Sequence, residues 1–191
     1  MVIDSPLHRL SSAEYGRLVD SGALDDSRVE LLDGMLVDVT PQGERHARVI
    51  QRLMRLCAGR MDLLRVQMPL AVAEGWTPEP DLALAMPDPD PTRHPPTALL
   101  VVEVAATSQA QDRSKAQAYA SAGVARYWLV DLSAEIVLDH SDPGPARYRL
   151  VRELAGDASL GAGVPDVRPT TVADLLSEPD GGPLPSGPAP S

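Results

Sequence analysis

The chain has 191 residues, 43% of them hydrophobic, which is enough for one domain with a substantial core and too short for two ordinary domains. Its net charge of −10 argues against a chain-wide footprint for nucleic acid, because duplex affinity comes largely from neutralised phosphates. One cysteine, no long apolar stretch and no signal-like start predict a reduced, soluble, cytoplasmic protein without a membrane span.

The first 60 residues predict a helix, a hairpin and a second helix. Residues 11–24 favour a short helix. Residues 29–39 hold Asp33 and Gly34 between two apolar runs, which is typical of a tight β-hairpin because both turn residues need positive φ. Residues 44–58 place apolar side chains at helical spacing, so they predict an amphipathic helix.

The rest of the chain alternates strand-like and helical segments. A helix is expected at 109–122, and strands at 63–72, 82–86, 99–105, 126–132, 135–140 and 146–154. The order strand, strand, helix, strand between residues 82 and 131 puts the strand at 99–105 in the centre of a mixed sheet. We therefore expect an α/β fold, with a mixed β-sheet flanked by helices.

The end of the chain differs from the rest in composition. Residues 178–191 are dominated by proline and glycine and offer almost nothing to bury, so ordering them would cost entropy without an offset. We expect a single domain over residues 1–177 and a disordered tail over 178–191.

Glu103 is an acidic residue inside the apolar run 99–105. An ionised carboxylate in such a strand needs a partner, a proton or a bound cation. Asp81 begins the preceding strand, and two carboxylates on neighbouring strands can converge on a hard cation such as Mg²⁺. The spacing alone equally allows a solvated Asp81 at a strand start and a salt-bridged Glu103.

Lys115 is the only lysine in the chain, beside 16 arginines. It lies on the helix that follows the Glu103 strand, from which its ammonium could reach back over the strand end. Lysine is a compact point charge whose pKa moves readily with burial, whereas arginine suits forked contacts. The alternatives are a chance survivor of compositional bias or a solvent-facing lysine paired with Asp112.

The helix at 44–58 carries a row of arginines on one face, Arg45, Arg48, Arg52 and Arg55. This row is the best candidate patch for a nucleic-acid backbone, and a solvated helix face is the alternative. His46 opens the same helix, where a histidine is often a local hydrogen-bond partner.

Six segments, taken in order, resemble one protein family. They are residues 29–34, 40–46, 80–84, 102–108, 112–120 and 122–131. In order and spacing they are similar to the Uma-type putative restriction endonuclease family, part of the PD-(D/E)XK nuclease superfamily. The resemblance covers roughly residues 10–155. It implies a restriction-endonuclease-like fold and phosphodiester hydrolysis that depends on Mg²⁺, with Mn²⁺ as a substitute.

The resemblance also implies roles for individual residues. Asp81 and Glu103 look like the paired catalytic acids that bind the metal, and Glu30 is similar to an additional acid, contributed upstream, that joins them as a catalytic and metal-binding residue. The superfamily lysine usually stands two positions after the second acid, which is Ala105 here. Lys115 resembles the lysine that has moved to the next helix in some relatives, where it would orient the attacking hydroxide or stabilise the phosphorane.

His46 resembles a recurrent family histidine that could touch phosphate or metal, so we group it with Arg45, Arg48 and Arg52 as nucleic-acid contacts. The implied partner is nucleic acid, with DNA first, and analogy to enzymes that cut two strands suggests a homodimer. One alternative is a catalytically weak or inactive nuclease fold acting as a binding or assembly module, which the charge of −10 favours. Another is a structural oligomer in which Glu103 and Lys115 form a buried ion pair.

Overall fold

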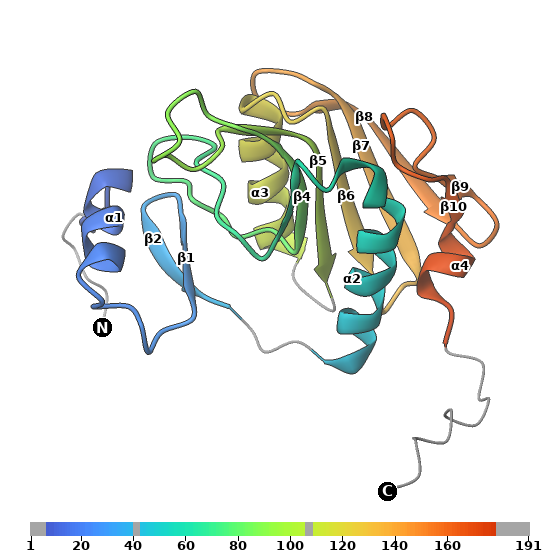
Figure 1. Ribbon diagram of the computed structural model, residues 1–191, viewed down its shortest axis with the longest axis horizontal. Coiled ribbons are helices and arrows are strands. Elements are labelled where there is room, and N and C mark those ends of the chain that lie inside the picture. The colour runs from blue at the N-terminus through green and yellow to red at the C-terminus, as the bar shows by residue number, and fades with distance from the viewer. Residues whose placement is uncertain (1–6, 40–42, 106–108, 179–191) are drawn as a thin grey trace, which may run out of the picture.

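A computed structural model describes residues 7–39, 43–105 and 109–178 (Figure 1). Its centre is a six-stranded sheet in the order β3-β4-β5-β6-β7-β8. The strands are β3 Leu64–Val66, β4 Leu82–Met86, β5 Thr97–Ala105, β6 Arg126–Asp131, β7 Ile136–Pro143 and β8 Tyr148–Ala155. Only β5 and β6 run parallel, and helix α3, Gln109–Ser121, connects them. The predicted mixed α/β fold, with the Glu103 strand inside the sheet, is confirmed.

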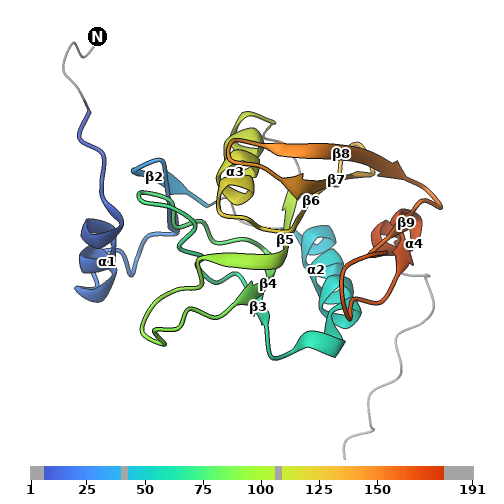
Figure 2. The same ribbon diagram turned by 90° about the horizontal axis from the view of Figure 1, so that it is seen from above.

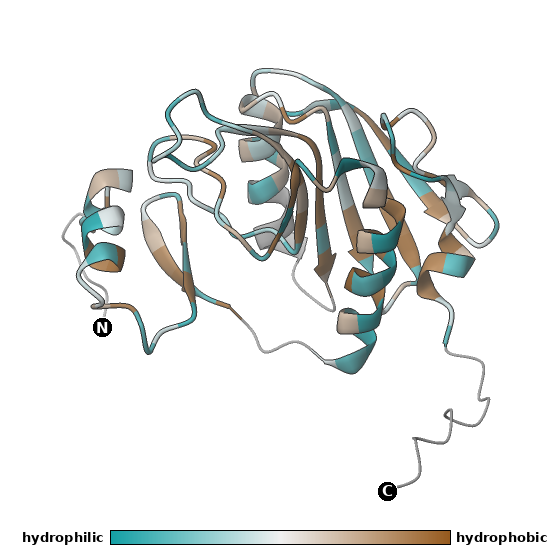
Figure 3. Ribbon diagram, in the orientation of Figure 1, coloured by the Kyte–Doolittle hydropathy of each residue, from teal (hydrophilic) through white to brown (hydrophobic). Residues whose placement is uncertain are grey.

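The two faces of the sheet are covered by different helices, α2 (Glu44–Leu56) on one side and α3 on the other (Figure 2). Leu82 and Leu84 of β4 belong to the core that includes Val49 and Leu53 of α2, whereas Ala83 belongs to the core that includes α3 residues. Successive side chains of a strand point to opposite faces, so a strand covered on both faces must be apolar throughout. Figure 3 shows this as brown central strands beside an α2 whose outer side is teal.

Helix α1, Ser12–Asp20, and the hairpin of β1, Val29–Leu32, and β2, Met35–Asp38, lie together at one side of the sheet (Figures 1 and 2). The predicted turn is confirmed, because Asp33 and Gly34 have φ of 50° and 72°. The backbone N–H of Thr77 donates to the carbonyl of Leu31 at 2.8 Å, which ties the hairpin to the segment that enters β4.

The C-terminal elements lie at the other side of the sheet, beside α2 (Figures 1 and 2). They are β9 Ser159–Leu160, β10 Thr170–Thr171 and α4 Val172–Leu176, and a 3-10 turn, Ala58–Arg60, follows α2. Leu160, Val172 and Leu175 are buried in the same core as the inner face of α2. These short elements carry no periodicity long enough to have been predicted.

The strand expected at 63–72 is wrong in its length, because β3 covers only Leu64–Val66. Gln67 has a positive φ of 49°, which turns the chain out of the ladder, and the N–H of Leu70 bonds to the carbonyl of Pro78 instead of a sheet neighbour. The strand expected at 135–140 is also longer than expected, since β7 covers Ile136–Pro143.

The predicted tail falls outside the described residues except for Glu178, and its disorder and the domain limits stay predictions. None of the helices in the described part of the chain is long and apolar enough to cross a membrane.

Candidate active site

Asp81 and Glu103 lie side by side on neighbouring strands. Strands β4 and β5 are antiparallel with Leu82 opposite Val102, so the residue before β4 sits next to the C-terminal end of β5. Oδ2 of Asp81 accepts a hydrogen bond of 2.9 Å from the backbone N–H of Val104, the residue after Glu103. Both acids are buried, with exposed fractions of 7% and 9%. The fold thus brings together the two acids that the sequence suggested as a pair.

Lys115 joins these acids from the middle of α3. Its Nζ lies 3.2 Å from Oε1 of Glu103 and 2.8 Å from Oε1 of Glu30, and its exposed fraction is 7%. A solvent-facing lysine is therefore excluded. The buried Glu103–Lys115 ion pair is present, which is the feature that the structural-oligomer alternative also requires.

Glu30 comes to the cluster from the peripheral hairpin. It lies on β1 and is buried, and its Oε2 accepts a hydrogen bond of 3.1 Å from the N–H of Glu79. The bond between Thr77 and Leu31 holds the hairpin at this point. The sequence alone gave no reason to bring a hairpin glutamate to the sheet, and only the family resemblance suggested it.

Tyr119 is a member of the cluster that sequence reasoning missed. Its hydroxyl donates to Oε1 of Glu103 at 2.8 Å, and the side chain is fully buried. Burial raises the pKa of Tyr119 well above its ordinary value, so the hydroxyl remains a donor. The available signal was its spacing of four residues from Lys115, which places both side chains on one face of α3.

His46 points inward from the start of α2 and is buried. Its Nε2 lies 3.0 Å from Oδ2 of Asp81, although the two atoms are not aligned as a hydrogen bond. The imidazole therefore neighbours an acid of the cluster that lies far from it in the sequence. A direct contact with nucleic acid stays a prediction for this residue.

Comparisons with known proteins give a family and a similar fold for this chain. A family model described as "Uma2: Putative restriction endonuclease" matches residues 13–172. The chain belongs to the Uma2 family. A crystal structure of a "putative nuclease belonging to DUF820" from Anabaena variabilis superposes with a TM-score of 0.62 at 14% sequence identity, covering 78% of this chain and 89% of that one. At that identity the likeness shows the fold alone. No curated protein matches the chain.

The acids of this Uma2 protein outnumber the cations around them. Burial raises the pKa of Glu103 to about 7; Lys115 opposes the shift, while Asp81 and Glu30 add to it. Burial also opposes the charged form of Lys115, but Glu103 and Glu30 outweigh this and raise its pKa. Glu30 and Glu103 therefore share one ammonium beside a third buried acid, Asp81, and among the side chains that the structure describes the cluster is short of positive charge.

A divalent cation would supply that missing charge. In the described residues, no three acidic, histidine or cysteine side chains form a ready-made metal centre. The available donors are the carboxylates of Asp81 and Glu103, while Glu30 faces Lys115. Such a donor set fits Mg²⁺, which commonly binds one or two protein carboxylates and keeps several waters.

Three of the four arginines in the row of α2 contact other parts of the chain, so the row is not wholly the freely solvated face considered above, and Arg55 is exposed. The contacts are Arg45 with Glu135 and the Leu132 carbonyl, Arg48 with Glu44 and Glu178, and Arg52 with the carbonyls of Leu175 and Ser177. Nucleic-acid binding by these arginines stays a prediction, and part of their hydrogen-bonding capacity is already used.

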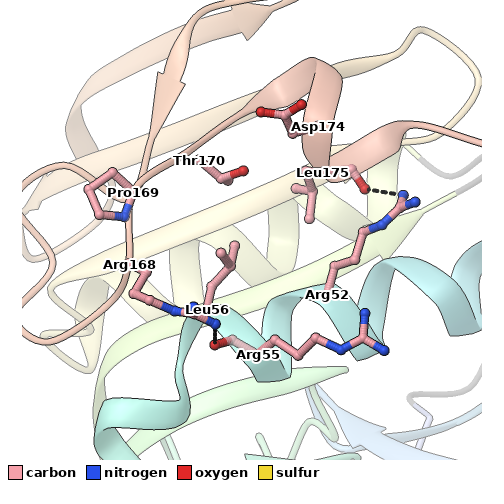
Figure 4. A pocket seen from close by; sticks show the side chains of 8 residues that line it. All are labelled: Arg52, Arg55, Leu56, Arg168, Pro169, Thr170, Asp174 and Leu175. Carbon is pink, nitrogen blue, oxygen red and sulfur yellow. Dashed lines mark hydrogen bonds between the residues drawn. The ribbon is translucent and has the colours of Figure 1, made fainter.

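A cavity of about 340 Å³ lies between the C-terminal end of α2 and the segment that leads into α4 (Figure 4). Arg52, Arg55 and Arg168 line it, and Arg168 hydrogen-bonds the Arg55 carbonyl. His46 and the acids lie at the opposite end of α2. This hollow is therefore separate from the acid cluster.

Proposed function

We propose that this Uma2-family protein is a Mg²⁺-dependent endonuclease that hydrolyses phosphodiester bonds of nucleic acid, with DNA as the first substrate to test. The observation that carries the proposal is the meeting of Asp81, Glu103 and Lys115 in one buried cluster that is short of positive charge. Family membership supports the same reaction class. Buried ionisable groups with perturbed pKa values are typical of active sites.

Asp81 and Glu103 would hold the metal, whereas Glu30 would pair with the ammonium of Lys115. A bound Mg²⁺ polarises a phosphoryl oxygen and lowers the pKa of a coordinated water. The N–H of Val104 fixes the orientation of Asp81, and the approach of His46 limits how its carboxylate can rotate.

Lys115 would act as a fixed positive charge and hydrogen-bond donor. Glu30 and Glu103 grip its ammonium at 2.8 Å and 3.2 Å, so the side chain is already oriented before substrate arrives. A donor held in this way can orient the attacking water and stabilise charge that develops on the phosphate. Glu30 then has a defined part, which is to hold the lysine.

A plasmid-nicking assay tests the proposal. We expect the purified wild type to nick supercoiled DNA with Mg²⁺ or Mn²⁺ and not with EDTA, and Asp81→Asn and Glu103→Gln to lose at least about 100-fold in rate. Glu153→Gln is the matched control, because this exposed acid on β8 lies in another part of the sheet. Nicking that persists equally in the two site variants would come from a contaminant and would overturn the proposal.

A second candidate is a nuclease fold that binds or assembles without turnover. The net charge of −10 and the internal contacts of Arg45, Arg48 and Arg52 favour it, because these contacts reduce the basic surface that α2 offers to a polyanion. The nicking assay, together with a filter-binding or gel-shift measurement, separates the endonuclease from the binding module. A folded wild type that binds DNA but does not nick it with Mg²⁺ or Mn²⁺ supports the binding module.

A further inference from the structure

The two oxygens of the Glu103 carboxylate lie in unlike surroundings. Oε1 accepts from the Tyr119 hydroxyl at 2.8 Å and from Lys115 Nζ at 3.2 Å. Oε2 forms no hydrogen bond or ion pair with the described side chains of residues 7–39, 43–105 and 114–178. A carboxylate oxygen offers about two lone-pair sites, so the two donors occupy Oε1 and leave Oε2 as the available ligand atom.

Of the two donors, Tyr119 is the one dedicated to Glu103. Lys115 also contacts Glu30, and that contact is shorter, 2.8 Å against 3.2 Å. Glu103 is the only hydrogen-bond acceptor of the Tyr119 hydroxyl among the described residues. The ring is fully buried and packs against Tyr127 with centroids 5.2 Å apart, so the hydroxyl has little freedom to move.

A glutamate that offers one oxygen suits one kind of cation better than another. Mg²⁺ demands near-octahedral geometry with short bonds, and a single carboxylate oxygen meets that demand. Ca²⁺ takes 6–8 oxygens and readily accepts both oxygens of one carboxylate. Blocking Oε1 therefore removes a binding mode that Ca²⁺ can use and Mg²⁺ does not need.

We propose that Tyr119 is a positioning residue that makes Glu103 a one-oxygen metal ligand and thereby biases the site toward Mg²⁺ over Ca²⁺. This inference rests on the proposed metal site. It assigns Tyr119 no contact with substrate or metal, because the residue acts only through the orientation of Glu103.

The test measures the dissociation constants of Mg²⁺ and Ca²⁺ by calorimetry, on the full chain without substrate. Tyr119→Phe keeps the ring and removes only the hydroxyl. We expect its Mg²⁺ affinity to fall about tenfold, as is usual when a group that orients a ligand is lost. The Ca²⁺ affinity of Tyr119→Phe should equal or exceed that of the wild type. The preference for Mg²⁺ over Ca²⁺ should therefore fall about tenfold or more.

Tyr148→Phe is the matched control. Its hydroxyl is also buried and donates at 2.9 Å, but to the backbone carbonyl of Val124 and not to an acid of the cluster. This variant should bind both ions as the wild type does. The deciding quantity is the ratio of the Mg²⁺ affinity to the Ca²⁺ affinity. If this ratio is the same in Tyr119→Phe as in Tyr148→Phe, the inference is overturned and the proposed function still stands.

Failure of the wild type to bind either ion is a different result, and it would remove the metal site itself. If Tyr119→Phe does not fold, a crystal structure of the wild type grown with Mn²⁺ decides. An ion bound to Oε2 of Glu103, with Oε1 still held by Tyr119, supports the inference. An ion bound to Oε1, or to both oxygens, overturns it.

Discussion

The sheet contains two buried ionic clusters that are built very differently. In the first, Asp139 of β7 is only 1% exposed and uses both of its oxygens. Arg126 contacts both oxygens, Arg152 donates to Oδ2 at 2.7 Å, and the indole of Trp128 donates to Oδ1 at 3.0 Å. One acid is thus matched by two guanidinium groups and a neutral donor.

The second cluster has the opposite balance. Glu30 and Glu103 share the single ammonium of Lys115, and Asp81 has a backbone N–H and a nearby imidazole. This difference in charge balance separates the two clusters: the requirements of folding account for the Asp139 cluster, but not for the cluster around Lys115. Buried polar groups are normally satisfied, so an acid cluster left short of cations needs a further explanation, and a ligand that brings positive charge is a direct one.

Removing the one cation of the acid cluster should have the largest effect on stability. Lys115→Met removes the ammonium that pairs with Glu30 and Glu103, and breaking a buried ion pair in this way costs about 3–5 kcal/mol. Urea unfolding in EDTA measures the loss. Lys115→Arg, which keeps the charge, should lose less, and equal midpoints for Lys115→Met and the wild type would show that the pair adds nothing.

Breaking the Asp139 cluster, in which the acid is matched by two arginines, should lower the free energy of unfolding by less and leave nicking activity intact. Asp139→Asn strips charge from hydrogen bonds to Arg126 and Arg152, and the loss of charged hydrogen bonds costs about 1.5–3 kcal/mol. Arg152 is half exposed, so solvent recovers part of that energy. We expect a lower urea midpoint with an unchanged nicking rate per folded molecule. A variant that loses nicking while fully folded would tie Asp139 to the active site.

The pattern of the sequence predicts the strands of this site well, because their signal is local. An apolar run covered on both faces reads as a central strand, and the acid inside it, Glu103, is conspicuous for the same reason. The strand before it begins at Leu82, where the pattern placed it, and that fixes Asp81 at its start. The fold class and the positions of Asp81 and Glu103 on their strands can therefore be predicted from short stretches of sequence.

The contacts that tune these acids could not be predicted in the same way. His46 reaches Asp81 only because α2 packs on β4, and Glu30 arrives on a hairpin tied to residue 77. Tyr119 looks like an ordinary core residue in a weakly amphipathic helix, and its hydroxyl gains a meaning only from Glu103. Each is a non-local contact, which local pattern does not encode.

The smallest expected effect is a pH response near the matched cluster. His140 follows Asp139 on β7, and its ring packs against Tyr127 and Tyr148, with centroids 5.0 Å and 5.6 Å away. Burial lowers the pKa of His140 below its ordinary 6.5, although the carbonyls of Leu138 and Tyr127 and the nearby Asp139 favour protonation.

The folded state thus prefers the neutral imidazole, so its contribution to stability is complete above pH 6.5 and is lost as pH falls below that value. Urea unfolding in EDTA at pH 7.5 and 5.5 should show a smaller loss for His140→Gln than for the wild type. The two losses of unfolding free energy should differ by less than the cost of Asp139→Asn. The His140 ring is only partly buried, so water can still solvate the protonated imidazole. Equal losses in both proteins would place the pH response elsewhere, and the acids around Lys115 would be the next groups to examine.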